Sequence, residues 1–416
     1  MHARNSKGQT GLVLLVLGCL GLLAVANGLR PLRWTPLVVP SFFAAWLTVE
    51  LAPQLLVLTI VTTAVLTVAV GASWIGLVVT ALVLAGLSVM VMESERAAAA
   101  ADTALADWPE RAERTPEHYS LLRRYFRPMS FRHPDVERTV DVAYGDLPRH
   151  KLDVYRRKDH PTGAPTLVQV HGGAWVIGDK REQGRPLMNH LAARGWVCFA
   201  PNYRLSPKAT WPDHLVDVKR AIAWVRENGA AYGADPGFLV LTGGSAGGHL
   251  TALCALTPND PMWQPGFEDA DTSVTACIPY YGVYDLNGET GTTAATVREK
   301  RLLARMVMKT RERDVYRLAS PLSHVNADAP PFFVVHGRND TLVPVQEARL
   351  LVERLRAASD QPVLYLELPG TQHAFDVFPS IRSDHVVRAV GRFCAYLQSA
   401  RSGSGNQPPA GDQRQV

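Results

Sequence analysis

The sequence predicts an α/β domain, built on a mostly parallel sheet, that follows an N-terminal group of membrane-spanning helices. Residues 11–92 are almost wholly apolar, and their only charged side chains are Arg30, Arg33 and Glu50. After residue 136, short apolar runs of strand composition alternate with segments of helical composition, which is typical of a parallel sheet. A Gly-x-Ser-x-Gly sequence, residues 243–247, lies between one expected strand and one expected helix.

Residues 1–92 are expected to form a transmembrane region of three or four helices. Apolar sequence continues well beyond residue 28, which a cleaved signal peptide does not explain. One candidate is shorter than the others and contains Glu50, so the number of spans is open. The candidate spans are residues 11–28, 36–52, 54–70 and 73–92.

Basic residues give a preference for the orientation of these helices. Arg4 and Lys7 favour a cytoplasmic N-terminus, whereas Arg96, Arg111 and Arg114 favour a cytoplasmic side after the last span. Both conditions are met only by an even number of spans. We therefore expect four helices with the catalytic domain in the cytoplasm; three helices would place the domain and the N-terminus on opposite sides.

The rest of the chain divides into a linker, a domain and a tail. Residues 93–135 are expected to be a helical juxtamembrane linker, whose second half mixes aromatic and arginine side chains that suit either the lipid headgroups or the domain surface. Residues 136–400 form the domain, with a cap insertion at about residues 286–328 that lacks strand composition. Residues 401–416 have the composition of a disordered tail.

Eight strands and five helices are expected in the domain. The expected strands are residues 138–144, 151–155, 166–170, 196–201, 238–241, 275–280, 331–335 and 363–368. The expected helices are residues 185–194, 214–232, 247–256, 344–358 and 381–399.

The Gly-x-Ser-x-Gly turn indicates a serine nucleophile. A tight strand-to-helix turn exposes Ser245 at the end of a sheet, but a serine hydroxyl attacks poorly until a base removes its proton. In folds with this turn, an acid and then a histidine follow the serine along the chain. Asp340 and His373 each follow an expected strand in that order. We therefore expect His373 to be the general base and Asp340 the carboxylate that orients it.

The sequence offers other acids and histidines for these roles. Asp285 also follows an expected strand and is the alternative acid. His336 precedes Asp340, which breaks the expected order, so a structural role is favoured. His385 lies in the last expected helix, and Asp217 is expected to hold a neighbouring loop.

An oxyanion hole needs at least two backbone N–H donors. One is expected from Ala246, directly after the nucleophile. The others are expected from Gly172 and Gly173, with Gly173 favoured, because glycine lets the backbone approach the substrate closely. His171 is expected to brace this loop.

Several motifs recur across the domain: HGGAW at 171–175, NYRLSP at 202–207, GGSAGGHL at 243–250, HGRNDTLVP at 336–344 and GTQHAF at 370–375. Together they resemble the α/β-hydrolase superfamily, in particular the hormone-sensitive lipase-like esterases. Those enzymes usually have a third glycine, HGGG, and an aspartate before the serine, where this chain has Ala174 and Gly244. HGG-x-W is similar to prenylcysteine methylesterase-like and arylformamidase-like relatives. The resemblance implies a Ser245–Asp340–His373 triad, an oxyanion hole at Gly172, Gly173 and Ala246, and no metal or organic cofactor.

The expected function is that of a membrane-anchored serine carboxylesterase or lipase. A prenylcysteine methylesterase-like or arylformamidase-like hydrolase is the nearest alternative, and an inactive membrane binding protein is the alternative from another class. The expected partners are an ester substrate and membrane lipid. A net charge of +5 without a dense basic block does not indicate nucleic-acid binding.

Overall fold

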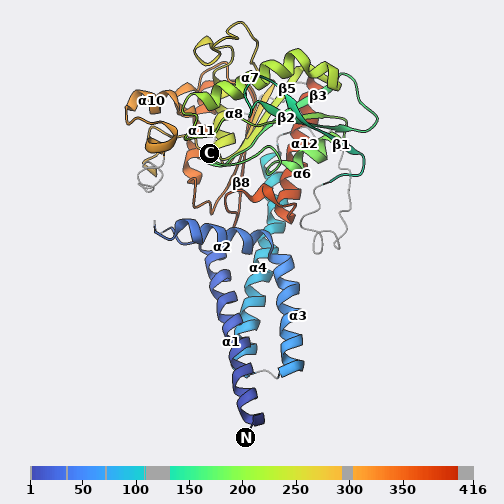
Figure 1. Cartoon of the computed structure of the whole chain (residues 1–416), viewed down its shortest axis with the longest axis vertical. Helices are drawn as coiled ribbons and strands as arrows, with labels where there is room; N and C mark the ends of the chain where they lie inside the picture. Colours follow the sequence, from blue (N-terminus) through green and yellow to red (C-terminus); the bar gives the residue numbers. More distant parts are fainter. Residues whose placement is uncertain are drawn as a thin grey trace.

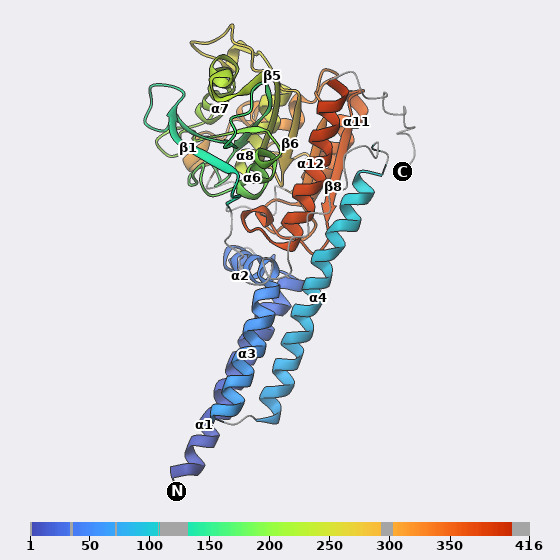
Figure 2. The same cartoon turned by 90° about the vertical axis from the view of Figure 1, so that its right-hand side faces the viewer.

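An α/β domain stands on a bundle of long apolar helices (Figures 1 and 2). The computed structural model describes residues 2–33, 36–70, 73–106, 108, 132–292 and 303–401. The N-terminus lies at the end of the bundle away from the domain. Most of the aromatic and arginine segment of the linker, part of the cap insertion and the tail after Arg401 lie outside the described residues.

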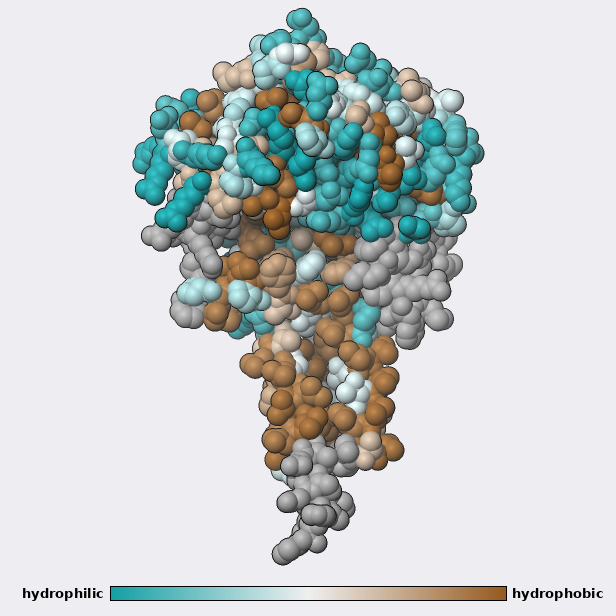
Figure 3. Space-filling model, in the orientation of Figure 1, coloured by the Kyte–Doolittle hydropathy of each residue, from teal (hydrophilic) through white to brown (hydrophobic). Residues whose placement is uncertain are grey.

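Three of the four N-terminal helices are long and apolar enough to cross a membrane. These three run side by side, and their surface is predominantly apolar (Figure 3). The fourth, α2, has 13 residues and lies across the domain end of the bundle. By length and composition, the described helices thus provide three candidate spans, and α2 is the shorter candidate that contains Glu50. The helices are α1 (His2–Leu29), α2 (Val38–Glu50), α3 (Ala52–Val70) and α4 (Trp74–Ala104).

Helix α4 continues past the expected boundary at residue 92 and joins the domain. Its last turns bury Ala97 and Ala101 in the core that includes residues of α12 (Ile381–Arg401). Two ion pairs join the helices as well, Glu95 with His385 at 3.1 Å and Asp102 with Arg392 at 3.0 Å. The helical first half of the linker is thus the end of the last long helix, and it is fixed to the domain.

The eight expected strands are all present and form one sheet. Their order is β1-β2-β4-β3-β5-β6-β7-β8, with β1 and β2 antiparallel to their neighbours and the other strands parallel. The strands are β1 (Val136–Ala143), β2 (Lys151–Arg157), β3 (Ala164–Val170), β4 (Val197–Pro201), β5 (Ala234–Gly244), β6 (Ala276–Tyr280), β7 (Phe332–Gly337) and β8 (Val363–Leu368).

Helices cover both faces of the sheet. One apolar core joins the sheet to α6, α12 and the end of α4, and two others join it to α7, α8 and α11. Between β6 and β7, the described part of the cap insertion contains the short helices η4 (Leu303–Val307), α10 (Arg313–Leu318) and η5 (Pro321–His324). The remaining domain helices are α6 (Arg185–Ala193), α7 (Asp213–Asn228), α8 (Ala246–Leu256) and α11 (Val345–Ala358).

Candidate active site

The expected serine turn is present between β5 and α8. Ser245 lies between them with φ of 58° and ψ of −121°, a backbone conformation that is strained for a residue with a side chain. Glycine at 247 is required by close packing, since a Cβ there would lie 2.2 Å from the Val170 carbonyl oxygen. Ser245 itself is partly exposed. The turn therefore presents its side chain at the carboxyl end of β5, beside the N-terminus of α8.

The expected acid and base contact each other directly. Asp340 follows β7 and His373 follows β8, and both side chains are buried. His373 Nδ1 lies 2.7 Å from Asp340 Oδ2. A carboxylate at Nδ1 fixes the proton on that nitrogen and leaves Nε2 as the basic nitrogen of the ring.

Tyr281 connects this pair to the serine turn. Its ring centroid lies 4.5 Å from that of His373. On its other side it packs on Gly244, where a Cβ would lie 2.6 Å from the Tyr281 hydroxyl. The structure thus gathers Ser245, Asp340 and His373 at one edge of the sheet. In the part of the chain that the structure describes, no hydrogen bond joins Ser245 to His373, and such bonds often tighten only when substrate is bound.

Asp340 is held as a carboxylate. Burial acts to raise its pKa, but the neighbouring His373 and His336 outweigh that effect and place the pKa well below the usual range. Its second oxygen accepts the backbone N–H groups of Leu342 and Val343, each at 2.8 Å. The charge and the direction of the carboxylate are therefore both fixed before substrate binds.

In the oxyanion loop, residues 171–175, the N–H group of Gly172 does not have the expected role. Its N–H donates to Gln183 Oε1 at 2.7 Å, so it is occupied and does not face a substrate. Gly172 still lies against Ser245, because a Cβ at 172 would be 3.0 Å from Ser245 Cβ. The N–H groups of Gly173 and Ala246 have no acceptor among the described residues, which leaves them as the available pair.

Comparison with known proteins places the chain among esterases. A family model described as BD-FAE matches residues 152–355. LipM of Mycobacterium tuberculosis, named a probable carboxylic ester hydrolase, is 50% identical over 303 residues, which cover 71% of this chain and 68% of LipM. The chain belongs to the same esterase family as LipM.

Two further proteins, one compared by sequence and one by structure, are also similar to this chain. The isoprenylcysteine alpha-carbonyl methylesterase ICME of Arabidopsis thaliana is 30% identical over 237 residues, covering 54% of each chain. The solved structure of the Thermogutta terrifontis esterase Est2 superposes with a TM-score of 0.52 at 27% identity, covering 68% of this chain and 97% of that one. These matches establish the α/β-hydrolase fold for the domain.

The other candidate acids and histidines make structural contacts in this esterase. Asp285 accepts the N–H groups of three following residues and so shapes the start of the cap insertion. Asp217 binds Arg204 at 2.7 Å, as expected for a residue that holds a loop. His171 stacks on Tyr203, with ring centroids 4.4 Å apart, and braces the oxyanion loop. His385 pairs with Glu95 of α4.

Asp376 is a structural link that sequence reasoning missed. Its buried carboxylate accepts a hydrogen bond from the Tyr281 hydroxyl, and Asp376 and Gly184 line the same small cavity. Burial is the main reason that its pKa is raised. Gly184 follows Gln183, so Asp376 brings the histidine loop (residues 369–376) next to the segment that holds Gly172. The motif GTQHAFD gave no sign of this role, because both partners are distant in sequence.

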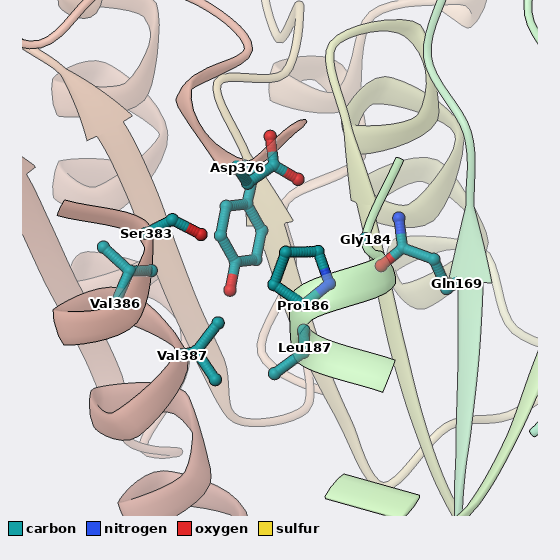
Figure 4. Close-up of a pocket in the computed structure, with 9 residues that line it drawn as sticks. Gln169, Gly184, Pro186, Leu187, Asp376, Ser383, Val386 and Val387 are labelled. Carbon is teal, nitrogen blue, oxygen red and sulfur yellow. The ribbon is translucent and has the colours of Figure 1, made fainter. Parts of the chain in front are cut away.

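A small cavity lies beside Asp376, between α6, α12 and the sheet (Figure 4). Asp376, Ser383 and Gln169 bring polar groups to it, and the side chains of Leu187 and Val387 close its other side. Because Asp376 lines it, the cavity lies next to the loop that carries His373.

Proposed function

We propose that the protein is a membrane-anchored serine carboxylesterase with Ser245 as nucleophile. His373 Nε2 takes the proton of the Ser245 hydroxyl as its oxygen attacks the ester carbonyl carbon. The N–H groups of Gly173 and Ala246 donate to the oxyanion of the tetrahedral intermediate. The intermediate expels the alcohol, which receives the proton from His373 and leaves an acyl-Ser245 ester. Water, deprotonated by His373, then releases the carboxylic acid.

The observation that carries this proposal is the 2.7 Å contact between His373 and Asp340 beside the serine turn. This contact gives the His373 imidazole a defined tautomer, next to the turn in which Ser245 follows β5. The membership of the LipM family supports ester bonds as the substrate. The three long apolar helices support the anchor.

Covalent labelling tests the nucleophile without knowledge of the natural substrate. The full chain in detergent should react with a fluorophosphonate probe and hydrolyse p-nitrophenyl esters, and Ser245→Ala should abolish both reactions. Ser399→Ala, at an exposed position of α12, is the matched control and should behave as wild type. Labelling and hydrolysis that survive in Ser245→Ala would refute the proposal.

The same labelling and hydrolysis assays distinguish a carboxylesterase from the alternative functions. A prenylcysteine methylesterase, suggested by the ICME relative, would prefer the methyl ester of a prenylated cysteine to simple esters. An arylformamidase-like enzyme would prefer a matched amide. A wild-type protein that neither labels nor hydrolyses any of these would indicate an inactive membrane binding protein instead.

With three spans, the catalytic domain and the N-terminus lie on opposite sides of the membrane. Arg30 and Arg33 follow the end of α1, and Arg96 lies in the second half of α4, which joins the domain. Arg4 and Lys7 lie in the first turns of α1, at the other end of the bundle. This small excess favours a cytoplasmic domain. Protease digestion of sealed inside-out vesicles should cut the domain, whereas protection in those vesicles would reverse the orientation.

A further inference from the structure

Helix α2 contacts the histidine loop directly. Trp46 Nε1 donates a hydrogen bond to the carbonyl oxygen of Ala374, the residue after His373, at 2.9 Å. The ring of Phe42 lies 6.2 Å from the His373 ring, nearly perpendicular to it. Trp46 also packs on Phe378, with ring centroids 5.0 Å apart. Helix α2 therefore forms one wall of the active site, next to the proposed general base.

A neighbouring side of α2 is apolar and exposed, and its Phe43 ring packs against the rings of Phe42 and Trp46, with centroids 5.0 Å and 6.3 Å away. Val39, Phe43 and Leu47 are 41%, 51% and 42% exposed. Their spacing of four residues places them in one stripe along the helix. Exposed apolar side chains of this size are unfavourable in water but not at the surface of a lipid bilayer. Helix α2 itself lies across the domain end of the bundle, whose surface is predominantly apolar (Figures 1 and 3).

Polar contacts hold α2 in this position at both ends. At its C-terminus, Glu50 is buried and binds Arg382 at 2.9 Å and the Ser380 hydroxyl at 2.6 Å. At its N-terminus, Ser41 is hydrogen-bonded to Asn27 of α1 at 2.7 Å. Because Glu50 and Trp46 are tied to the domain, α2 cannot be a further span and lies where the bundle meets the domain.

The position of α2 bears on the alcohol part of the substrate. In ester cleavage, His373 gives its proton to the leaving alcohol, so that group must lie beside the imidazole. Phe42 borders the same ring, so an apolar alcohol group finds an aromatic contact there. A polar alcohol would gain nothing from this wall.

We propose that α2 is an interfacial helix, and that the substrate is an ester of a long-chain, membrane-resident alcohol that reaches His373 from the bilayer along α2. The stripe of Val39, Phe43 and Leu47 rests on the lipid surface. Phe42 is a specificity-determining residue for the alcohol group, and Trp46 is a positioning residue for the histidine loop. This inference rests on the proposed esterase function and adds the substrate class.

The test compares two butyrate esters that differ only in the alcohol. The full chain is reconstituted in phosphatidylcholine vesicles with the domain outside, and kcat/KM is measured for ethyl butyrate in solution and hexadecyl butyrate in the bilayer. Phe42→Ala should lower the ratio of hexadecyl to ethyl turnover about tenfold. A residue with a merely structural role would change both values equally and leave the ratio as it was, which would overturn the assignment of Phe42.

The stripe is tested by Val39→Ser combined with Leu47→Ser, which leaves the Phe43 ring on Phe42 and Trp46 in place. The same ratio should fall about tenfold, because the vesicle-borne ester no longer reaches the site efficiently. Met262→Ser removes a more exposed apolar side chain from η2 (Pro261–Trp263), beside α7, and should keep the wild-type ratio. An unchanged ratio in the double variant refutes the docking of α2 on lipid, and a change of oligomer size in detergent without a change in ratio would assign the stripe to self-association instead.

Trp46→Phe keeps the ring and removes the hydrogen bond to Ala374. It should lower kcat for both esters about threefold to tenfold with little effect on KM, whereas an unchanged kcat would remove the positioning role. Fluorophosphonate labelling of every variant separates the two proposals. If wild type does not label, the esterase function itself fails; if it labels and the ratios do not move, only the inference about α2 fails.

Discussion

The imidazole of His336 lies against the carboxylate of Asp340. His336 Nε2 is 3.3 Å from Asp340 Oδ2, the same oxygen that contacts His373, and 3.0 Å from the Val343 carbonyl oxygen. His336 is fully buried at the end of β7. The order of residues along the chain argued against His336 as the base, and the structure shows that it supports the acid.

Removal of this support should weaken catalysis. We expect His336→Ala to lower kcat by roughly 10- to 100-fold, since a hydrogen bond to a charged group contributes about 1.5–3 kcal/mol. His336→Gln places an amide N–H near the position of Nε2 and should recover most of the loss. Steady-state kinetics on one short ester check this, and equal rates for Ala and Gln variants would contradict it.

Gln183 is expected to position the oxyanion loop. Gln183→Ala frees the Gly172 N–H and should lower kcat about tenfold, because the loop beside Ser245 loses its anchor. Gln183→Glu retains the acceptor and should be milder. A rise in kcat for Gln183→Ala would instead mean that the freed N–H of Gly172 serves as an oxyanion donor, as the sequence suggested.

The buried pair of Glu50 and Arg382 should show strong coupling. Arg382→Met leaves an uncompensated buried carboxylate, and loss of one partner in such a pair costs about 3–5 kcal/mol of stability. The double variant Glu50→Gln with Arg382→Met should be more stable than Arg382→Met alone. Thermal unfolding in detergent measures this, and additive losses would show that the pair does not couple α2 to the domain.

Acid should destabilise the domain before it protonates Asp340. Burial is the main cause that lowers the pKa of His171 and of His214 to about 4, against about 6.5 in an unfolded chain. Between these values the unfolded state binds protons that the native state excludes. Stability should therefore fall as pH decreases from 6.5 to 4, by up to about 1.4 kcal/mol per unit for each group.

Unfolding midpoints between pH 7 and pH 4.5 test this slope. His214 lies 3.1 Å from the Ser206 hydroxyl, and His214→Gln keeps a polar partner there without a titrating ring. The variant should show a shallower loss of stability than wild type over the same range. Identical slopes would exclude His214 as a contributor.

The sequence by itself determined the eight strands, their helices and the position of the serine turn. These features follow from local rules: period-two and period-3.6 apolar patterns, and glycines that close packing requires at 243 and 247. It also predicted Asp340 and His373, since each follows a strand that ends at the same edge of the sheet.

Only the tertiary structure decided what surrounds those residues. Three contacts join segments that only folding brings together, and local composition does not predict such pairs. They are the contacts of Gly172 with Gln183, of Tyr281 with Asp376 and of Trp46 with Ala374. The role of α2 shows the reason most clearly. Its apolar composition suits a membrane span, but burial of Glu50 against Arg382, 332 residues further along the chain, holds it against the loop that carries His373.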